Sequence, residues 1–473
     1  MIKFGTDGWR AKIAEEFTFG NVRLVTLALI NFIRETAKGS NSIVIGYDNR
    51  FLSENFAMEA AKVASSAGFD TWVSKGSLPS PALSFAVKQF NAACGIMITA
   101  SHNPPEYNGF KIKASFGGSA SPEMTSQVER RLKMILEKKT PVEAGSEKNI
   151  RHFDPKKEYF EQLKKFVDLK SIKRADMKII VDPMYGSASG YLKDILDEAG
   201  IASEEIRGIR DPLFGGANPE PLPHNLEELI SVTREASLKE QKKMVVGLAL
   251  DGDGDRIGAV GSNGDFISPH HIFAILLKHL VENKKMTGEV VKTFNITNLI
   301  PSMAKKYGLT LHETPIGFKY ICELMLKRDI LIGGEESGGI GIKGHIPERD
   351  SSLASLLLLE AAAAFKKPLE GLLEDIMSEF GHYYYNRSDL RLEEEKKLRV
   401  LNILRNDPPK SFASLSVKEV KTLDGIKFEL MDNSWILFRA SGTEPLLRIY
   451  CEATSPALLA SILGRGEEIA DKA

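Results

Sequence analysis

Three times along the chain, a short apolar run ends abruptly in a polar loop, and a helical pattern follows. The three runs cover residues 96–98, 245–250 and 330–334. Apolar strands that alternate with helices are typical of α/β domains, in which ligands bind at the carboxyl ends of the strands. We therefore expect three similar α/β domains with mixed sheets, whose polar loops face a shared central cleft.

The last hundred residues show a different pattern. Short alternating segments occur at 417–422, 427–431, 435–439 and 447–452, and a helix is expected over 456–472. Alternation with a period of two is typical of antiparallel strands with one solvated face. We therefore expect a smaller C-terminal α+β domain. The four expected domains are 1–148, 149–261, 262–372 and 373–473.

The composition excludes several classes of protein. Of 473 residues, 43% are hydrophobic and 26% are charged, as in ordinary globular proteins. A net charge of −1 provides no overall attraction for nucleic acid or for an anionic membrane, and no apolar stretch is long enough to span a bilayer. Cys94, Cys322 and Cys451 show neither disulfide nor zinc spacing, which suits a reducing compartment. We expect a cytoplasmic protein without nucleic-acid or membrane partners.

The run TASHNP, residues 99–104, places Ser101 directly after the first apolar run. A hydroxyl at the end of a buried strand can act as a nucleophile or carry a transferred group, although an ordinary Ser/Asn/Pro turn is the alternative. The next strand, 108–113, would carry Lys111 back past this loop as a charge partner or acid/base group, or as a plain surface lysine. Arg10 lies in a glycine-flanked opening segment, which is either a terminal turn or part of a site.

Three aspartates alternate with glycine in the run DGDGDR: Asp251, Asp253 and Asp255. Alternate residues of an extended chain point the same way, so the carboxylates converge and need a cation between them. Hard oxygen ligands suit Mg²⁺. An EF-hand loop is excluded, because its required glycine and glutamate positions hold Arg256 and Ser262. A solvated acidic turn remains the alternative.

Two further loops carry polar groups suited to a sugar phosphate. The run RASGTEP, residues 439–445, combines a guanidinium, hydroxyls and flexible backbone, as in a phosphate-binding loop, or else is a plain turn. The run GEESG, residues 334–338, offers acceptors for sugar hydroxyls, or else is an acidic turn. Lys319 and Arg349 would add positive charge near it, although each alone is more often a surface charge.

Taken together, the chain offers a serine, a divalent-metal loop, a polyol loop and a phosphate loop. This set suits phosphoryl transfer between a serine and a sugar phosphate, with metal and cationic side chains stabilising the transferring group. Such a function requires that the loops fold into one site.

These four motifs closely resemble the signature loops of the α-D-phosphohexomutases, in order and over the whole chain. The matching segments are 99–104, 251–256, 334–338 and 439–445. The resemblance implies three similar α/β domains and a smaller C-terminal domain around a central cleft. Two positions depart from the family pattern: Gly339 stands where several members have histidine, and Ser351 stands where glycine is usual.

The resemblance also implies roles by position. Ser101 would carry the phosphate and would hold Mg²⁺ together with Asp251, Asp253 and Asp255. The catalytic residues beside it would be Arg10, His102 and Lys111. The substrate-binding residues would be Arg256, Gly317, Lys319, Glu335, Ser337, Arg349, Arg439, Ser441, Gly442, Thr443 and Arg448.

In this family the serine gives its phosphate to a hexose monophosphate, and the resulting hexose 1,6-bisphosphate returns the other phosphate. The Glu-Glu-Ser of the sugar loop resembles members that interconvert glucose 1-phosphate and glucose 6-phosphate. A phosphomannomutase or a dual-specificity mutase is the nearest alternative. A metal-dependent sugar phosphatase and a non-catalytic sugar-phosphate binder are the alternatives from other classes. The expected state is a monomer or a homodimer.

Overall fold

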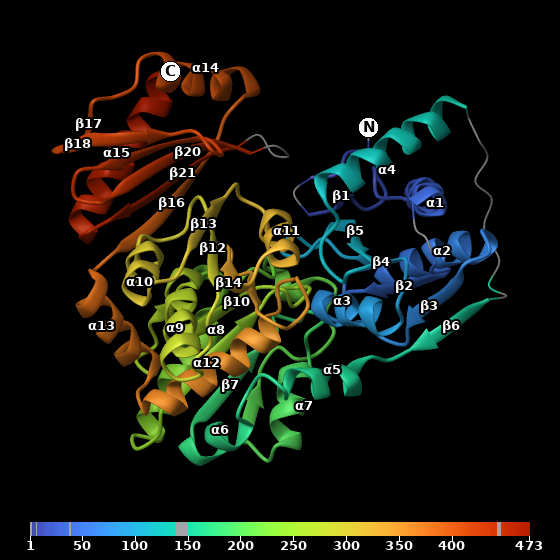
Figure 1. Ribbon diagram of the computed structural model, residues 1–473, viewed down its shortest axis with the longest axis horizontal. Coiled ribbons are helices and arrows are strands. Elements are labelled where there is room, and N and C mark those ends of the chain that lie inside the picture. Colours follow the sequence, from blue (N-terminus) through green and yellow to red (C-terminus); the bar gives the residue numbers. More distant parts are fainter. Residues whose placement is uncertain are drawn as a thin grey trace. The chain divides into compact units, whose positions relative to one another are not determined.

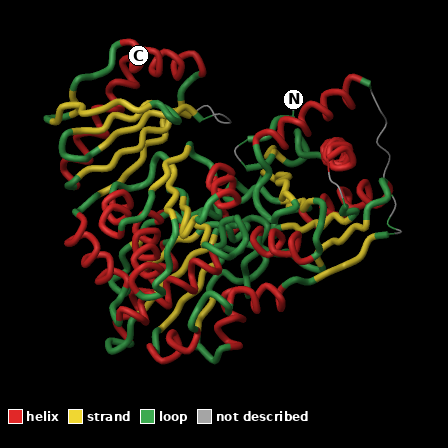
Figure 2. Tube along the Cα trace, in the orientation of Figure 1, coloured by secondary structure: helices red, strands yellow, loops and turns green. Residues whose placement is uncertain are grey.

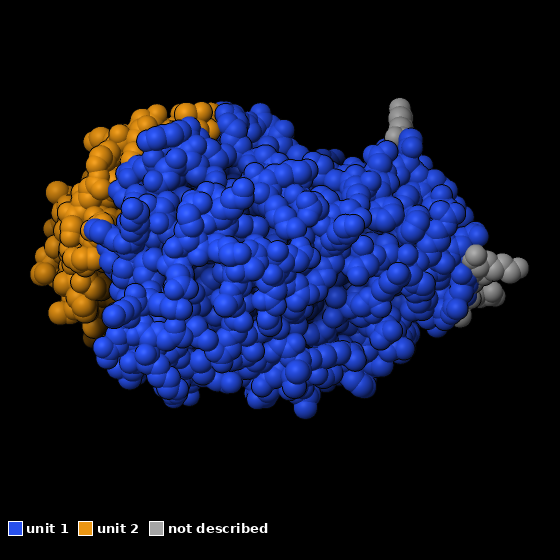
Figure 3. Space-filling model, turned by 90° about the horizontal axis from the view of Figure 1, so that it is seen from below, with its two compact units in different colours: residues 1–286, 317–372 blue, residues 287–316, 373–473 orange. Residues whose placement is uncertain are grey.

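The computed structural model describes residues 2–5, 7–36, 39–138, 145, 147, 149–441 and 446–473 (Figure 1). The chain divides into two compact units, which are coloured separately in Figure 3. The first consists of residues 1–286 and 317–372, and the second of residues 287–316 and 373–473. The four domain boundaries expected from the sequence remain a prediction.

The first unit begins with a mixed six-stranded sheet in the order β1-β5-β4-β2-β3-β6. Its strands are β1 (Trp9–Lys12), β2 (Ser42–Tyr47), β3 (Asp70–Ser74), β4 (Cys94–Ile98), β5 (Tyr107–Ala114) and β6 (Ile150–Phe153). Strand β2 runs parallel to β3 and β4, whereas β5 runs antiparallel to β4 and β1. The parallel strands at its centre account for the continuous apolar runs in the sequence.

Helices cover both faces of this sheet. They are α1 (Phe19–Thr36), α2 (Ser53–Ser66), α3 (Ser80–Gln89) and α4 (Pro122–Glu137). Ile43 and Ile45 of β2 share one core with α1, α2 and α4. Gly46, which points the opposite way, faces Leu83 of α3. Because both faces are covered, every residue of β4 is buried and the chain can leave the sheet only at the strand end.

The second sheet of this unit has five strands in the order β11-β10-β9-β7-β8. They are β7 (Lys178–Asp182), β8 (Ser203–Glu205), β9 (Val245–Leu250), β10 (Ile257–Val260) and β11 (Phe266–Ile267). The associated helices are α5 (Lys156–Leu163), α6 (Leu169–Ala175), α7 (Tyr191–Glu198) and α8 (Glu227–Lys239). Strands β9 and β10 pair antiparallel with Leu250 opposite Ile257, so the DGDGDR run is the loop of a hairpin.

A second hairpin of this unit carries the GEESG run. Strands β14 (Ile330–Gly334) and β15 (Ile340–Ile342) pair antiparallel with Gly334 opposite Ile340. The helices of this part are α9 (Pro269–Glu282), α11 (Phe318–Lys327) and α12 (Ser351–Phe365). Helix α12 is apolar on all sides and almost wholly buried, which makes it a core helix.

The second unit contains a parallel pair of strands and a six-stranded antiparallel sheet, shown by element type in Figure 2. The parallel pair is β12 (Glu289–Thr293) and β13 (Leu311–Thr314), joined through α10 (Leu299–Tyr307). The antiparallel order is β16-β21-β20-β19-β18-β17. Its strands are β16 (Tyr384–Arg391), β17 (Ser411–Phe412), β18 (Leu415–Lys421), β19 (Ile426–Leu430), β20 (Trp435–Ala440) and β21 (Leu446–Ala453).

Helices α14 (Glu394–Asn406) and α15 (Pro456–Lys472) accompany this sheet, while α13 (Leu369–Phe380) precedes it in the chain. Strand β16 and helix α14 were not among the expected elements, because both are rich in exposed polar residues and give only a weak apolar pattern. The expected fold class, α/β with mixed sheets and a C-terminal α+β part, is confirmed. Among the described residues, none of the helices combines the length and the apolar character needed to cross a bilayer.

Candidate active site

Ser101 lies in the loop after β4 and is completely buried. Its hydroxyl donates a hydrogen bond to Asp251 Oδ2 at 3.0 Å, although the two residues are 150 positions apart. The Nδ1 atom of His102 lies 3.5 Å from the same hydroxyl. The serine loop and the aspartate run, which the sequence placed on separate strand ends, therefore meet directly.

Asp251, Asp253 and Asp255 converge as expected. Each offers a carboxylate oxygen within 4.8 Å of the others, and all three side chains are fully buried. Asp251 Oδ1 closes the turn by accepting the backbone N–H groups of Asp255 and Arg256, at 2.9 and 3.1 Å. Among the residues that the structure describes, the buried Oδ1 atoms of Asp253 and Asp255 have no hydrogen-bond partner. Buried carboxylate oxygens that lack donors are suited to a divalent cation, so these residues fit a metal.

Glycine is required in the aspartate loop for close approach as well as for turning. A Cβ atom at Gly252 would lie 2.5 Å from the Ser101 carbonyl oxygen. On the other side, a Cβ at Gly186 would lie 2.8 Å from the Gly252 carbonyl oxygen. The absence of side chains at these positions lets the backbone of the aspartate loop contact the backbone of the serine loop.

Two buried cations bind the carboxylates. Lys111 Nζ lies 2.7 Å from Asp253 Oδ2, 3.2 Å from Asp255 Oδ2 and 2.8 Å from Asp7 Oδ2. Arg349 Nη2 lies 2.6 Å from both Asp255 Oδ2 and Asp7 Oδ2. Lys111 and Arg349 are thus buried parts of one charge network, and the reading of either as a surface charge is wrong.

Asp7 was not among the predicted site residues, although it bridges both of these cations. The signal available in the sequence was its position in the glycine-flanked segment that also holds Arg10. Ser80, the first residue of α3, was missed as well. Its hydroxyl donates to Asp253 Oδ2 at 2.5 Å and its backbone N–H donates to the Asp253 carbonyl oxygen at 2.8 Å, which fixes this aspartate.

Burial and charge shift the pKa values of this network in opposite directions. Burial, then the neighbouring carboxylates of Asp255 and Asp253, raise the pKa of Asp251 well above its ordinary value. Burial also opposes ionisation of Asp253, but the Lys111 ammonium outweighs it and lowers the pKa of Asp253. Burial would likewise lower the pKa of Lys111, but the surrounding carboxylates raise it, so Lys111 stays protonated.

The sugar-loop residue Glu335 joins the same network. Arg349 Nη1 donates to Glu335 Oε2 at 3.0 Å, and burial raises the pKa of Glu335. A side chain at Gly339 would collide with the Arg349 side chain, so the glycine leaves the path open for this contact. The backbone N–H of Ile257 donates to the Gly338 carbonyl oxygen at 3.1 Å, which joins the aspartate and sugar loops.

The remaining predicted residues of the first unit lie around this network. Arg10 Nη1 donates to Asn103 Oδ1 of the serine loop at 2.6 Å. Arg256 Nη1 lies 3.3 Å from Glu220 Oε1, while its buried Nε has no hydrogen-bond partner among the described residues. Ser337 is half-buried in the sugar loop.

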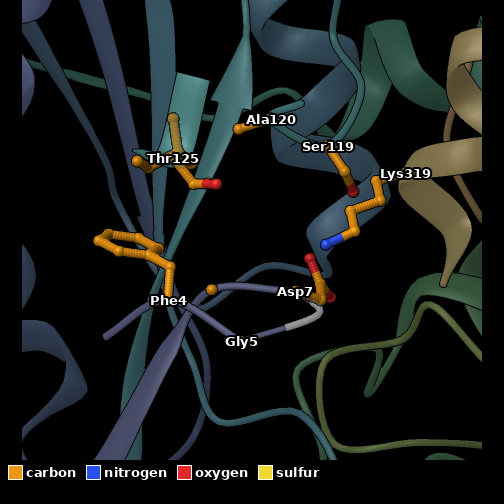
Figure 4. Close-up of a pocket in the computed structure, with 9 residues that line it drawn as sticks. Phe4, Gly5, Asp7, Ser119, Ala120, Thr125 and Lys319 are labelled. Carbon is orange, nitrogen blue, oxygen red and sulfur yellow. The ribbon is translucent and has the colours of Figure 1, made fainter. Parts of the chain in front are cut away.

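Gly317 precedes helix α11 with a φ of +136°, a conformation that favours glycine. Lys319, in the first turn of that helix, lines a small cavity of about 10 Å³ with Asp7 and Ser119. Figure 4 shows its amine pointing toward the Asp7 carboxylate. The volume is that of about one water molecule.

The predicted phosphate-loop residues belong to the second unit. Arg439 on β20 and Arg448 on β21 are direct register partners, with Ser441 just after β20. Arg439 Nε donates to Asp424 Oδ1 at 3.0 Å, and Arg448 Nε lies 3.8 Å from Asp389 Oδ1. Like charges directly opposite each other are unfavourable in a sheet unless anions offset them. Gly442 and Thr443 lie outside the described residues.

Four family models match the chain. They describe phosphoglucomutase/phosphomannomutase α/β/α domain I at residues 1–139, domain II at 157–264, domain III at 268–380 and the C-terminal domain at 390–467.

Relatives match over almost the whole chain. A phosphoglucomutase/phosphomannomutase of Thermococcus kodakarensis is 29% identical over 470 residues, covering 99% of this chain and 98% of the relative. A Methanosphaera stadtmanae protein assigned as a phosphoglucosamine mutase is 30% identical, covering 97% of this chain and 96% of the relative. The solved structure of a Thermus thermophilus protein assigned as a phosphomannomutase has a TM-score of 0.87 and 36% identity, covering 99% of each chain. The chain therefore belongs to the phosphoglucomutase/phosphomannomutase family of α-D-phosphohexomutases.

Proposed function

We propose that this protein is a Mg²⁺-dependent phosphohexomutase that interconverts glucose 1-phosphate and glucose 6-phosphate through a phosphoserine at residue 101. The observation that carries the proposal is the 3.0 Å hydrogen bond between Ser101 Oγ and Asp251 Oδ2. This contact places the serine hydroxyl against three convergent carboxylates that fit a metal. Mg²⁺, when bound there, supplies positive charge to the phosphoryl group.

The chain's own residues support two opposite transfers. In the first, a hydroxyl oxygen of the hexose monophosphate bonds to phosphorus, the bond between phosphorus and Ser101 Oγ breaks, and a hexose 1,6-bisphosphate results. In the second, Ser101 Oγ bonds to the phosphorus of the other phosphate, the bond between that phosphorus and the sugar oxygen breaks, and the isomeric hexose monophosphate leaves. Lys111 and Arg349, held beside the aspartates, stabilise the negative charge of the transferring group. His102, 3.5 Å from the serine hydroxyl, is placed to move its proton.

Substrate recognition is assigned to three groups of residues. Glu335 accepts hydrogen bonds from sugar hydroxyls, and the Ser337 hydroxyl can accept from them or donate to them. Arg256, whose buried Nε has no hydrogen-bond partner among the described residues, binds a phosphate oxygen near the reacting group. Arg439, Ser441, Gly442, Thr443 and Arg448 bind the non-reacting phosphate. Gly317 and Lys319 are further substrate-binding residues, in the first unit. The two guanidinium groups that face each other on β20 and β21 support this assignment, because guanidinium forks suit the oxygens of a phosphate.

The first experiment measures conversion of glucose 1-phosphate to glucose 6-phosphate with Mg²⁺ and a glucose 1,6-bisphosphate primer. Wild type is expected to be active, and Ser101→Ala is expected to lose the activity. Ser126→Ala, on the exposed face of α4, serves as the matched control. Equal rates for the wild type and the Ser101 variant would refute the phosphoserine. Release of free phosphate at the rate of substrate loss would instead indicate a phosphatase.

The preferred sugar is tested by comparing kcat/KM for glucose, mannose and glucosamine 1-phosphates. The Glu-Glu-Ser sugar loop favours glucose, while the curated relatives include both glucose/mannose and glucosamine mutases at similar identity. The highest kcat/KM for glucose 1-phosphate is the expected result. A preference for the mannose or glucosamine phosphate would be consistent with the mutase reaction, but it would show that glucose 1-phosphate is the wrong substrate assignment.

A further inference from the structure

The serine loop has an internal support that the transfer chemistry does not use. Three carbonyl groups of this loop, and that of Tyr107 at the start of β5, accept hydrogen bonds from one side chain, the fully buried Arg50. Arg50 Nη1 donates to the carbonyl oxygens of Pro104 and Tyr107 at 2.8 and 3.1 Å. Its Nη2 donates to those of Ser101 and Asn103 at 2.7 and 2.6 Å. A single guanidinium therefore satisfies carbonyls that the loop cannot pair in a helix or sheet.

Asp48 holds this guanidinium from the other side. Asp48 Oδ2 lies 3.1 Å from Arg50 Nε and also accepts the Thr99 hydroxyl at 2.6 Å. Asp48 Oδ1 accepts the Arg50 backbone N–H at 3.0 Å and the Ser53 hydroxyl at 2.7 Å. The carboxylate thus connects the loop after β2 with the first residue of the serine loop.

Ser101 needs such support because its φ is +55°, in the left-handed region. This conformation is unfavourable for a residue other than glycine, because Cβ crowds the following carbonyl oxygen. The Thr99 hydroxyl accepts the Ser101 backbone N–H at 2.9 Å, and Arg50 binds the Ser101 carbonyl oxygen. Both backbone groups of the serine are therefore fixed while its hydroxyl faces Asp251.

The loop after β2 also contacts the part of the unit that carries the aspartates. The side-chain amide of Asn49 donates to the carbonyl oxygens of Tyr185 and Gly186, both at 2.8 Å. The Arg50 guanidinium carbon lies 4.8 Å from the centre of the Phe214 ring. Since Gly186 packs against Gly252, the same short segment contacts the serine loop directly and reaches the aspartate loop through Gly186.

Only a guanidinium matches this arrangement. Its planar fork presents five N–H donors in fixed directions, and here four nitrogen–oxygen contacts radiate from Nη1 and Nη2 to different carbonyls. A lysine ammonium would carry the same charge, but its donors radiate from one nitrogen and cannot span the loop. The substitution Arg50→Lys therefore keeps the positive charge at this position and removes the planar fork of donors.

We propose that Asp48, Arg50 and Thr99, here called the loop clamp, are positioning residues that hold Ser101 in its left-handed conformation with the hydroxyl directed at the aspartates. The inference rests on the proposed phosphoserine chemistry. It assigns the clamp no contact with the sugar, so loss of the clamp slows phosphoryl transfer and leaves hexose phosphate binding intact.

The test uses Arg50→Lys in the full-length protein, with Arg210→Lys as the matched control on an exposed position of a neighbouring loop. We expect Arg50→Lys to lower kcat about 100-fold, as misplacement of a reacting group by about 1 Å does, with little change in KM. Single-turnover transfer from glucose 1,6-bisphosphate to Ser101, followed by intact mass, should slow by the same factor. The control should match wild type in both assays.

Full activity of a folded Arg50→Lys, shown by an unchanged circular dichroism spectrum and melting curve, would overturn the clamp while leaving the mutase intact. A rise in KM with unchanged kcat would overturn it too, because it would indicate a binding role. If Arg50→Lys does not fold, Thr99→Val removes only the hydroxyl that accepts the Ser101 N–H. The proposal predicts a lower kcat for Thr99→Val, and an unchanged kcat in this variant would refute the loop clamp. Inactive wild type would refute the proposed function instead.

Discussion

Lys111 in the first unit and Lys427 in the second are each only 1% exposed, yet their surroundings are opposite. Lys111 Nζ contacts three carboxylates, those of Asp7, Asp253 and Asp255, at 2.7 to 3.2 Å. Lys427 Nζ donates to the Phe294 carbonyl oxygen at 3.0 Å and lies 4.3 Å from the centre of the Trp435 ring.

The surroundings decide the charge of each lysine. The carboxylates around Lys111 raise its pKa against the effect of burial. Burial, aided by the nearby Lys292 ammonium, lowers the pKa of Lys427 to about 7. A buried lysine is therefore a fixed cation only where carboxylates from other segments meet it, and such a cation can serve phosphoryl transfer.

The largest expected contrast is in catalysis. Lys111→Met should lower kcat for glucose 1-phosphate by about 10³-fold, since it removes a charge partner and acid/base candidate from the reacting phosphate. Lys427→Met, a matched change at an equally buried lysine, should leave kcat close to wild type. Steady-state kinetics on both variants checks this contrast. Similar losses in the two would show that burial of lysine, rather than its carboxylate partners, is what matters.

The next contrast concerns metal affinity. In Lys111→Met the oxygens of Asp253 and Asp255 lose a competing ammonium, and unit charges about 4 Å apart interact by roughly 4 kcal/mol at an effective dielectric constant of about 20. Since each 1.4 kcal/mol is a factor of ten in affinity, we expect Mg²⁺ to bind this variant up to about 10³-fold more tightly, as measured by calorimetry. Lys427→Met should bind Mg²⁺ like wild type, and Asp251→Asn should bind it more weakly. Unchanged affinity in Lys111→Met would argue against the shared carboxylates as the metal site.

The smallest effect concerns the pH dependence of stability. Because the folded pKa of Lys427, about 7, lies below its ordinary value of 10.5, the unfolded chain binds one more proton between these values. Stability from this group therefore rises with pH above about 7, by at most roughly 1.4 kcal/mol per pH unit, and is lost as pH falls toward 7.

Urea unfolding of wild type and Lys427→Met at about pH 7 and about pH 9 measures how Lys427 contributes to the free energy of unfolding, because the variant lacks the titrating group. The variant should be relatively more stable at the lower pH, and the difference should shrink as pH rises. A difference that does not change with pH would mean that Lys427 is protonated in the folded protein.

Local patterns in the sequence were enough to predict the strand ends of the candidate site and the convergence of its aspartates. The apolar runs before Ser101, Asp251 and Glu335 identified the strand ends, and the DGDGDR spacing predicted convergent carboxylates. In the structure these runs form the strands β4, β9 and β14, and the three aspartates converge as expected. These features depend on residues within a few positions of one another, so the periodicity of the chain records them.

For other parts of the candidate site, the sequence contains no local pattern that predicts them. Three parts of the candidate site come from distant parts of the chain: Asp7 contacts Lys111, Ser80 contacts Asp253, and Arg50 binds the Ser101 carbonyl oxygen. Each alone resembles an ordinary turn or cap. Strand β16 was missed because its pairing with β21 supplies the stability that its polar sequence does not indicate. Long-range partners of this kind are fixed only by packing.

By itself, the sequence determined the strands that precede the serine, aspartate and sugar loops, the order of the four motifs and the residue types that they contain. The tertiary structure alone decided which cations meet which carboxylates, and therefore that Lys111 is charged while Lys427 has a pKa of about 7. The reason is physical: burial costs any charge its hydration, and whether that cost is offset depends on groups that folding brings within about 4 Å from remote positions.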